Sequence, residues 1–393
     1  MMYKTHTHTW YLSLVFATLF AISSLSGQVS LQNRTILDVP ERAQLLTSHA
    51  GEVVGYWIED ELSLGPTITK YKNEQVLKVL STTSNRTQQF VVVTIEHPVQ
   101  FSSRTMAISV MSSEGKEIFS REIDVSWDHA FPSFSPIDGG NRIVITDPQS
   151  QEVRLLNEDG TLSEFHSLFS NDERDHEKVI AIEHHSPSHV YLAGMKSAAL
   201  DQTDNVALFS WNLNDSPFEI KELPLTVLRN ISLSTSGYAA ISGTVASGQE
   251  YNQQHRLILL SLEDFTSFSY TILPKKMIWA DETLFAADNR RLIVLKPNSD
   301  RPLAEIQFPS RLIPLGLFTA GSSVHLLYAG DSRYSEGKNE LGSIGIMTID
   351  QQTLDHSEIS VSRDYHKVVN ILPIEDGKFF LQLDGELLEY SAD

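Results

Sequence analysis

A repeating arrangement of four short strand-like runs is the feature that most constrains the fold of this chain. It is clearest over residues 131–166, FPSFSPIDGGNRIVITDPQSQEVRLLNEDGTLSEFH. Four apolar runs alternate there with turn-forming groups at 138–140 (DGG), 147–150 (DPQS) and 159–160 (DG). Gly, Asp and Pro favour tight turns, so consecutive runs are expected to pair as hairpins. Four antiparallel strands in about 40 residues match one blade of a β-propeller.

Weaker copies of this unit follow along the chain, and several of them close on a proline. The alternating runs ILDVP, IKELP, YTILP and IQFP end at Pro40, Pro224, Pro274 and Pro309. Proline has no N–H to donate to a sheet, so it suits the outermost strand of a blade. After each of the last three prolines a new apolar run begins, as a crossover to the next blade requires. The alternative is chance placement of prolines in another all-β fold.

Grouping the apolar runs by four predicts the extent of the blades. Helical periodicity is almost absent after residue 27, and runs rich in Val, Ile, Leu, Phe and Tyr recur between turn residues. The grouping predicts blades near 127–168, 176–224, 226–274, 275–310 and 311–362.

The two ends of the chain are expected to share the last blade. Residues 365–391 hold only three strand-like runs, so a fourth strand is expected from around Thr35 to Val39. Such an exchange closes the ring and removes an exposed edge. Residues 41–126 then hold one long blade or two ordinary ones. The prediction is a single all-β propeller domain of four-stranded blades over residues 28–393, with seven blades favoured and eight possible.

The first 27 residues differ from the rest of the chain. A weakly basic start at Lys4, His6 and His8 precedes the apolar stretch 10–22, WYLSLVFATLFAI, and small residues follow it. This layout predicts a secretory signal peptide over residues 1–27. A spanning helix needs about 20 apolar residues, so no stable membrane anchor is expected. The predicted location is therefore periplasmic or extracellular.

Composition excludes several classes of function. The 393-residue chain has no cysteine, which in an exported protein excludes disulfides, cysteine nucleophiles and cysteine-bound zinc. Its formal net charge is −20, and this field repels phosphate backbones, so no nucleic-acid partner is expected. Solubility is the simplest role for the charge. We expect a monomer.

The clearest blade also resembles known repeat families. The segment 142–165 resembles an NHL-type propeller repeat, which runs apolar strand, Asp, turn, apolar strand, Asp-Gly and a closing aromatic. Before it, 131–140 (FPSFSPIDGG) resembles the Pro-x-Phe-Ser-Pro-Asp-Gly opening of TolB-type repeats, with Ile137 inserted before Asp138. The resemblance covers about a tenth of the chain. It implies a propeller and no particular activity, because such folds host binding modules, scaffolds and enzymes.

Motifs that carry catalysis are missing from the sequence. There is no Gly-x-Ser-x-Gly elbow, no Ser-x-Asp-x-Gly-x-x-Trp box of sialidases, no phosphate-binding glycine loop and no His-Glu-x-x-His helix. The sequence therefore assigns no catalytic residue and predicts no cofactor.

Ligand-type residues concentrate in one place. Five of the 14 histidines fall between His166 and His189. The concentration comprises Asp175, His176, Glu177, Glu183, His184, His185 and His189. Two turn histidines with a carboxylate can hold zinc, but strand alternation points His184 and His185 to opposite faces. The simpler interpretation is a solvated polar loop, and no metal site is predicted.

Three long insertions indicate where a partner binds. They span 196–205, 245–255 and 330–342, and each joins the second and third strands of its predicted blade, which places all three on one face. Their polar and aromatic residues include Glu250, Tyr251, Gln253, Gln254, Asp331, Arg333, Tyr334 and Glu336. Because loops on rigid scaffolds carry function, the prediction is a non-catalytic binding or scaffold module for a protein or a glycan. The simpler alternative is that these loops vary in length without any role in binding.

An enzyme remains the alternative function. It would be a hydrolase or lyase with several acidic or histidine side chains converging at the channel mouth and with shifted pKa values. A binding module is expected to show instead an exposed aromatic or apolar patch on one face.

Overall fold

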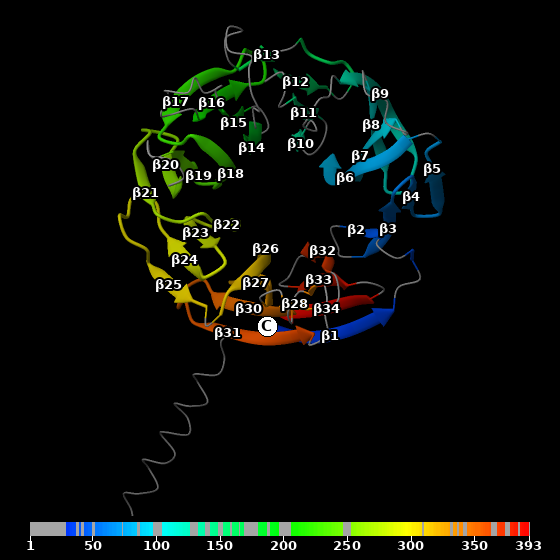
Figure 1. Cartoon of the computed structure of the whole chain (residues 1–393). Helices are drawn as coiled ribbons and strands as arrows, with labels where there is room; N and C mark the ends of the chain where they lie inside the picture. Colours follow the sequence, from blue (N-terminus) through cyan, green and yellow to red (C-terminus); the bar gives the residue numbers. More distant parts are fainter. Residues whose placement is uncertain are drawn as a thin grey trace, which may run out of the picture.

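The chain forms a ring of eight four-stranded antiparallel sheets around a central axis, as the computed structural model shows (Figure 1). The residues that the structure describes are 29–36, 39–40, 43–48, 52–72, 74–84, 87–96, 104–125, 133–137, 142–147, 152–157, 159–164, 166–168, 180–186, 189–195, 206–246, 253–308, 310–330, 333–335, 338–340, 344–362, 368–373, 378–383 and 386–392.

The first four blades follow one another along the chain. Blade 1 comprises β2 (Gln44–Thr47), β3 (Val53–Ile58), β4 (Glu61–Leu64) and β5 (Thr67–Lys70). Blade 2 comprises β6 (Glu74–Ser84), β7 (Thr87–Glu96), β8 (Arg104–Ser112) and β9 (Glu117–Val125). Blade 3 comprises β10 (Ser133–Ile137), β11 (Arg142–Asp147), β12 (Glu152–Leu156) and β13 (His166–Ser167). Blade 4 comprises β14 (Ile180–Ser186), β15 (His189–Met195), β16 (Val206–Asn212) and β17 (Phe218–Leu223).

The other four blades complete the ring. Blade 5 comprises β18 (Val227–Leu233), β19 (Tyr238–Ala246), β20 (Gln253–Ser261) and β21 (Ser267–Tyr270). Blade 6 comprises β22 (Lys276–Ala280), β23 (Thr283–Ala287), β24 (Arg291–Leu295) and β25 (Ala304–Gln307). Blade 7 comprises β26 (Leu312–Ala320), β27 (Ser323–Gly330), β30 (Ile344–Asp350) and β31 (His356–Ser362), with the hairpin of β28 (Arg333–Ser335) and β29 (Lys338–Glu340) inserted. Blade 8 comprises β32 (Val368–Pro373), β33 (Lys378–Leu383), β34 (Glu386–Ala392) and β1 (Val29–Ile36).

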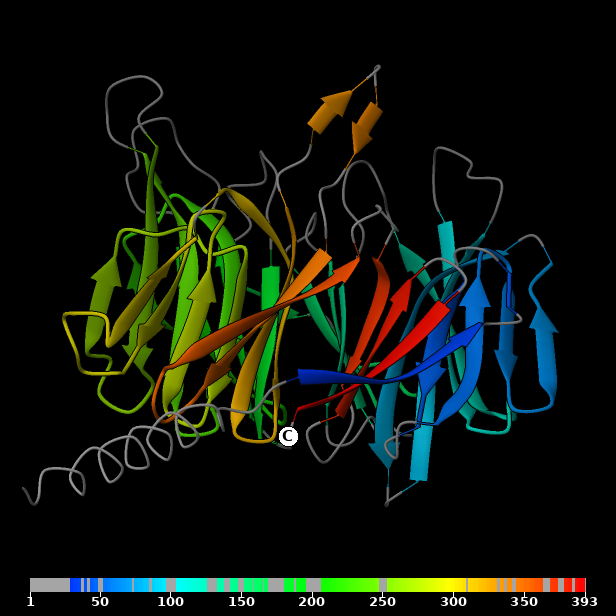
Figure 2. The ribbon, with the colours of Figure 1, turned by 90° about the horizontal axis from the view of Figure 1, so that it is seen from below.

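Antiparallel order within the blades gives the ring two different faces. The first strand of each blade lies nearest the axis (Figure 1). The connection from the second to the third strand and the crossover to the next blade therefore share one face, which we call the crossover face. The turns between the first and second strands and between the third and fourth share the other, which we call the hairpin face. Figure 2 shows the two faces edge-on, with the β28–β29 hairpin standing on the crossover face.

The hydrophobic core lies between neighbouring blades. Because each blade packs face to face against the next, its middle strands are buried on both sides and read as continuous apolar runs, such as VALFSW in β16. Between blades 4 and 5, Leu208 and Leu228 pack with Ile241 and Ile258. Between blades 7 and 8, Phe318 and Phe379 pack edge to face with ring centroids 4.8 Å apart. Blade stacking thus provides a separate apolar layer at each seam.

Both ends of the chain meet in blade 8 and close the ring. Strand β1 pairs with β34 in antiparallel register, from Val29 opposite Ala392 to Ile36 opposite Glu386. Arg34 donates to both carboxylate oxygens of Glu386 at 2.5 and 2.7 Å. The closure is therefore made by a backbone ladder and an ion pair in which one Arg34 nitrogen contacts both carboxylate oxygens.

A buried amide joins blade 8 to blade 1. Gln382 on β33 is 2% exposed. Its Nε2 donates to the Ala43 carbonyl at 2.6 Å, and its Oε1 accepts from the Leu45 N–H at 3.1 Å. The side chain thus joins segments 339 residues apart in the sequence across the seam between blades 8 and 1.

The structure confirms the predicted fold and decides the number of blades. The ring is an all-β propeller closed by N- and C-terminal strands, and it has eight blades, the possible number, rather than the favoured seven. Residues 41–126 hold two blades because β6 to β9 form a complete sheet separate from β2 to β5. The closing N-terminal strand lies at Val29–Ile36, earlier than the expected 35–39.

Other expectations are met in part. Pro224 and Pro274 follow the outermost strands β17 and β21, as proposed for prolines at blade ends. The predicted signal peptide lies outside the described residues, so it stays a prediction. No helix in the described part of the chain is long and apolar enough to cross a membrane.

Replacement of the seam amide tests the closure. We expect Gln382→Ala to lower the free energy of unfolding by about 2 kcal/mol, because two hydrogen bonds are lost in a buried site. Urea unfolding measures the change. The control Gln352→Ala removes an exposed side chain between β30 and β31 and should change stability by less than about 0.5 kcal/mol. Equal effects of the two substitutions would contradict the assigned role of Gln382.

Candidate functional site

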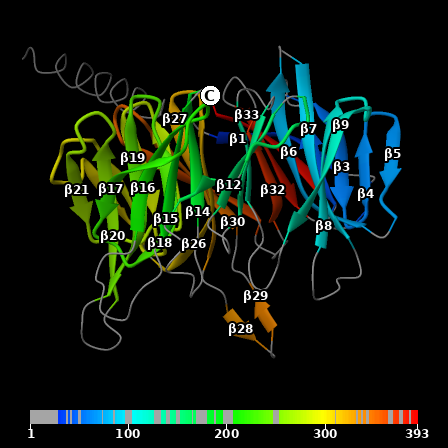
Figure 3. The same cartoon turned by 90° about the horizontal axis from the view of Figure 1, so that it is seen from above.

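The strand ends that the three predicted insertions join lie on the crossover face. They join β15 to β16, β19 to β20 and β27 to β30, which are the second and third strands of blades 4, 5 and 7. In the third, β28 and β29 form a two-stranded sheet of their own, with Arg333 opposite Glu340 and Ser335 opposite Lys338. Figure 3 shows this hairpin beyond the ends of the blade strands. The insertion 196–205 lies outside the described residues.

Loop residues singled out from the sequence lie in several places. Arg333 and Tyr334 belong to β28, and Gln253 and Gln254 belong to the start of β20 rather than to a loop. Glu250, Tyr251, Asp331 and Glu336 lie outside the described residues.

The histidine-rich segment is only partly described. Asp175, His176 and Glu177 lie outside the described residues, and Glu183, His184 and His185 belong to β14. The register against β15 shifts between His184 and Ser186, so a bulge falls at His185. His189 on β15 contacts the Ser210 hydroxyl through Nε2, and its ring lies 5.2 Å from that of Tyr191. Within the described residues, no group of three or more His, Asp or Glu side chains is placed to hold a metal ion.

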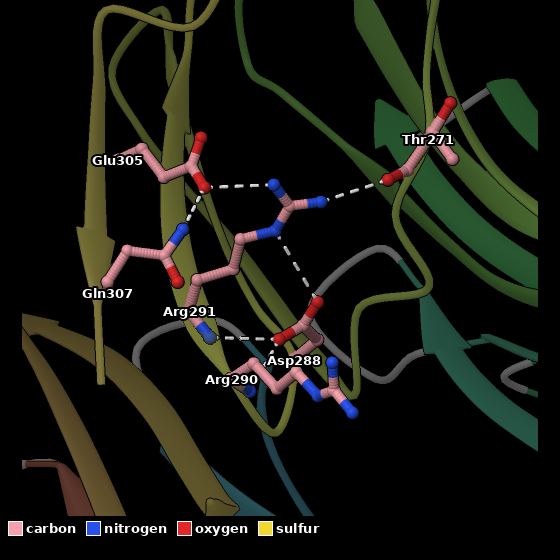
Figure 4. A network of polar contacts seen from close by, with 6 residues as sticks. All are labelled: Thr271, Asp288, Arg290, Arg291, Glu305 and Gln307. Carbon is pink, nitrogen blue, oxygen red and sulfur yellow. Dashed lines mark hydrogen bonds and ion pairs between the residues drawn. The ribbon is translucent and has the colours of Figure 1, made fainter. Parts of the chain in front are cut away.

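A polar network organises the crossover-face end of blade 6 (Figure 4). Asp288 Oδ1 accepts from the N–H groups of Arg290 and Arg291 at 2.6 and 2.9 Å, which fixes the turn between β23 and β24. Arg291 then reaches Glu305 Oε1 at 2.9 Å and Asp288 Oδ2 at 3.7 Å. It also donates to the Thr271 carbonyl at 3.0 Å. One guanidinium therefore links blade 6 to the crossover that arrives from blade 5.

Backbone hydrogen bonds attach both crossovers of blade 6 to this same turn. Lys275 N donates to the Ala287 carbonyl at 2.7 Å on the incoming side. On the outgoing side, Phe308 N donates to the Arg290 carbonyl at 2.8 Å and Leu312 N to the Asn289 carbonyl at 2.9 Å. Three segments separated in sequence are thus held together at one end of the blade.

These segments bring positive charge together. The side chains of Lys275, Lys276, Arg290 and Arg311 are all exposed, and none of them forms an ion pair within the described part of the chain. Figure 4 shows the Arg290 guanidinium pointing away from the network. We call these four residues the blade 6 patch. With Arg291 they make five cations against the two carboxylates of Asp288 and Glu305, which Arg291 already binds.

The sequence interpretation missed this patch. Its local signals were Lys275-Lys276 directly after Pro274 and the pair Arg290-Arg291. The overall charge of −20 gave no reason to expect a positive patch. The sequence also does not show that Arg311 lies at the same turn as Arg290. The four cations cluster because both crossovers contact the turn between β23 and β24.

Strongly shifted pKa values occur in the interior rather than at a channel site. His325 is fully buried, with Phe318 at 5.3 Å and Phe379 at 5.6 Å between ring centroids. Its Nδ1 lies 3.1 Å from the Thr348 hydroxyl, and its Nε2 has no hydrogen-bond partner among the described residues. Burial lowers the pKa of His325 to about 4, and the Ala320 backbone opposes this only in part. Its environment is that of a core side chain.

The tyrosines with shifted pKa values show the same pattern. Burial is the first cause that raises the pKa of Tyr71, Tyr328 and Tyr390 to about 12. Tyr328 donates to Glu358 at 3.2 Å and lies over Gly345, where a Cβ would meet the ring at 2.5 Å. Tyr390 stacks on Phe379 in the core of blade 8. All three stabilise sheet packing.

An apolar binding patch is also missing from the described surface. The large hydrophobic side chains that are exposed there belong mostly to outer strands of different blades, and they are Leu31, Val53, Ile68, Ile118, Phe218 and Leu303. Single exposed apolar residues are normal on soluble proteins. The described residues therefore show neither converging acidic and histidine side chains at the channel mouth nor an exposed apolar patch. They do show a concentration of positive charge on the crossover face, the blade 6 patch.

Comparison with known proteins supports the fold. No protein-family model and no curated protein matches the chain. A solved structure of the dihydro-heme d1 dehydrogenase NirN in complex with DHE is similar, with a TM-score of 0.55 at 12% identity over 89% of this chain and 73% of that one. A streptogramin B lyase gives 0.47 at 12% identity over 93% and 98%, and AztD from Citrobacter koseri gives 0.47 at 11% over 87% and 87%. At 12% identity the likeness to NirN shows the fold alone, and it says nothing of the NHL or TolB resemblance.

Two adjacent arginines provide a matched test of the network. Arg291→Ala is expected to cost about 1 kcal/mol of unfolding free energy, because it removes contacts with Glu305, Asp288 and the Thr271 carbonyl at a partly exposed site. Arg290→Ala should cost less than about 0.5 kcal/mol, since its side chain is exposed. Chemical denaturation of both variants distinguishes them. A larger loss for Arg290→Ala would contradict the network.

Acid destabilisation tests the burial of His325. Its folded pKa of about 4 lies below the ordinary value of 6.5. The unfolded chain therefore binds this proton more readily, and the stability contributed by the neutral ring is complete above about pH 6.5 and is lost as the pH falls towards 4. Between pH 7.5 and 5.0 we expect this group to account for about 2 kcal/mol.

The matched variants isolate that contribution. His325→Gln should flatten the fall in stability between pH 7.5 and 5.0, measured by urea unfolding at each pH. His255→Gln replaces an exposed histidine of β20 and should leave the slope as in the parent protein. Parallel slopes for the parent and His325→Gln would show that His325 is not buried as described.

Proposed function

We propose that the protein is an exported, non-catalytic binding module whose crossover face contacts a protein or a glycan. The observation that carries this proposal is the β28–β29 hairpin, inserted between β27 and β30 of blade 7. Strands β27 and β30 pair continuously from Ser323 opposite Asp350 to Ala329 opposite Ile344. The blade is therefore complete without the hairpin.

Physical considerations make a purely structural role a poor explanation of the hairpin. Each strand has only three residues, and both outer edges of the two-stranded sheet are unpaired among the described strands. Isolated two-stranded hairpins are marginal in water, and ordering a residue costs about 1–2 kcal/mol of backbone entropy. A partner that pairs with or packs on the hairpin would offset that cost.

Three further points favour binding over catalysis. The strongly shifted pKa values of the described residues belong to the interior packing of the blades. Nothing in that part of the chain favours a hydrolase or lyase at the channel mouth. The cations of the blade 6 patch lie on the same face as the hairpin. Export rests on the signal-like sequence of residues 1–27.

Site-specific photo-crosslinking tests the proposed face. A crosslinking amino acid at Tyr334, in β28, is expected to capture a partner in cells that produce the full chain. The same amino acid at Gln352, exposed at the hairpin-face end of the same blade, should capture none. Adducts are detected as shifted bands and identified by mass spectrometry. Capture from Gln352 alone, or from neither position, would contradict a binding role for the crossover face.

A further inference from the structure

We propose that the blade 6 patch, formed by Lys275, Lys276, Arg290 and Arg311, binds an acidic segment of a partner protein. This inference rests on the proposed function, because it names the chemistry of the partner that the crossover face would take. Its main evidence is the charge at blade 6, and the hairpin is used only to separate a peptide from a sugar chain.

The first step concerns which charges are available. Asp288 Oδ1 is occupied by two backbone N–H groups, and its Oδ2 lies 3.7 Å from Arg291 Nε. Glu305 is bound by Arg291 at 2.9 Å and by the Gln307 amide. The local carboxylates are therefore used within the network. The four exposed cations of the patch have no such partner in the described part of the chain, which leaves a local excess of positive charge.

The second step concerns how the patch is held. Lys275 is attached to Ala287 by a backbone hydrogen bond of 2.7 Å, and Leu312, next to Arg311, is attached to Asn289 by one of 2.9 Å. The turn that carries Arg290 is itself fixed by Asp288. On this chain, binding therefore orders only side chains and not the backbone that carries them, which lowers the entropic cost.

The third step weighs the patch against the charge of the whole molecule. A chain of net charge −20 repels long polyanions over distance. At physiological ionic strength the screening length is about 8 Å, so a short acidic segment in contact with the patch interacts mainly with the nearest cations. Arginine binds a carboxylate through two parallel N–H groups, and lysine provides a compact charge. These properties suit a few carboxylates on a peptide better than an extended polymer of phosphates.

The fourth step separates a peptide from a sugar chain. Sugar rings commonly pack their apolar face on aromatic side chains, which combine apolar area with a polar edge. Among the described residues, the large aromatic side chain that is prominently exposed is Phe218, at 57%. It begins β17 and so lies at the hairpin face of blade 4. On the same face, blade 7 carries the β28–β29 sheet with its unpaired edges, which an extended peptide can extend by strand addition.

Charge reversal at the two ends of blade 6 provides a matched test. The variant Lys275→Glu with Arg290→Glu changes the patch. The control Lys296→Glu with Arg301→Glu makes the same change in charge on exposed residues of the turn between β24 and β25, at the hairpin face. The probe is labelled polyglutamate, a peptide of about six consecutive glutamates, titrated by fluorescence anisotropy with full-length protein at physiological and high salt.

The parent and the control should bind the peptide, and the patch variant should bind about tenfold more weakly at physiological ionic strength. High salt should reduce the difference. Thermal unfolding checks that all three proteins fold alike. Polygalacturonate, a carboxylated sugar polymer, is titrated in parallel.

Several results would overturn the inference. They are no binding of polyglutamate by the parent, equal weakening by both double variants, or tighter binding of polygalacturonate than of the peptide. Failure here is separable from failure of the proposed function. Crosslinks from Tyr334 that persist in the patch variant, with no binding of polyglutamate, would keep the crossover face as a binding surface while removing the acidic segment as its ligand.

Discussion

Pairing of β1 with β34 is the interaction on which the ring depends. Seven blades are built from contiguous stretches of chain, whereas blade 8 needs Val29–Ile36 beside Glu386–Ala392. The entropic cost of closing a loop grows only with the logarithm of its length, so even a closure of this span costs about 5 kcal/mol. The backbone ladder and the Arg34–Glu386 pair oppose that cost. Gln382 then fixes the closed blade to blade 1.

Once the ring is closed, strand order decides what each face can do. Connections between second and third strands and crossovers between blades share the crossover face, so the insertion in blade 7 and the charged turn in blade 6 lie on the same face although they belong to different blades. The blade 6 patch depends on this order, because Lys275 and Arg311 come from two different crossovers. Backbone hydrogen bonds attach both crossovers to the β23–β24 turn, so the charges of the patch lie on an ordered part of this face.

Sequence alone predicted the parts of this structure that depend on local chemistry. The unit at residues 131–166 is blade 3, because its Asp, Gly and Pro turns specify hairpins wherever they occur. The number of blades was harder to predict from the sequence. Strands β6 to β9 have 9 to 11 residues, and such long alternating runs do not show how many sheets they form.

The candidate site was harder to predict than the fold. Its face followed from the positions of the insertions, which were read correctly as connections between second and third strands. Its charged residues could not be predicted from the sequence. Lys275, Arg290 and Arg311 come together only because backbone hydrogen bonds join their three segments. Much of the histidine-rich segment lies outside the described residues, so its role stays a prediction.

Hydrogen exchange of the full-length protein with and without a bound acidic peptide tests the central claim most directly. The account predicts slower exchange at the crossover-face ends of blades 6 and 7, over residues 271–276, 287–291 and 333–340, with the hairpin-face turns at 296–303 and 351–355 unchanged. Protection confined to the hairpin face, or spread evenly around the ring, would contradict the assignment of binding to the crossover face.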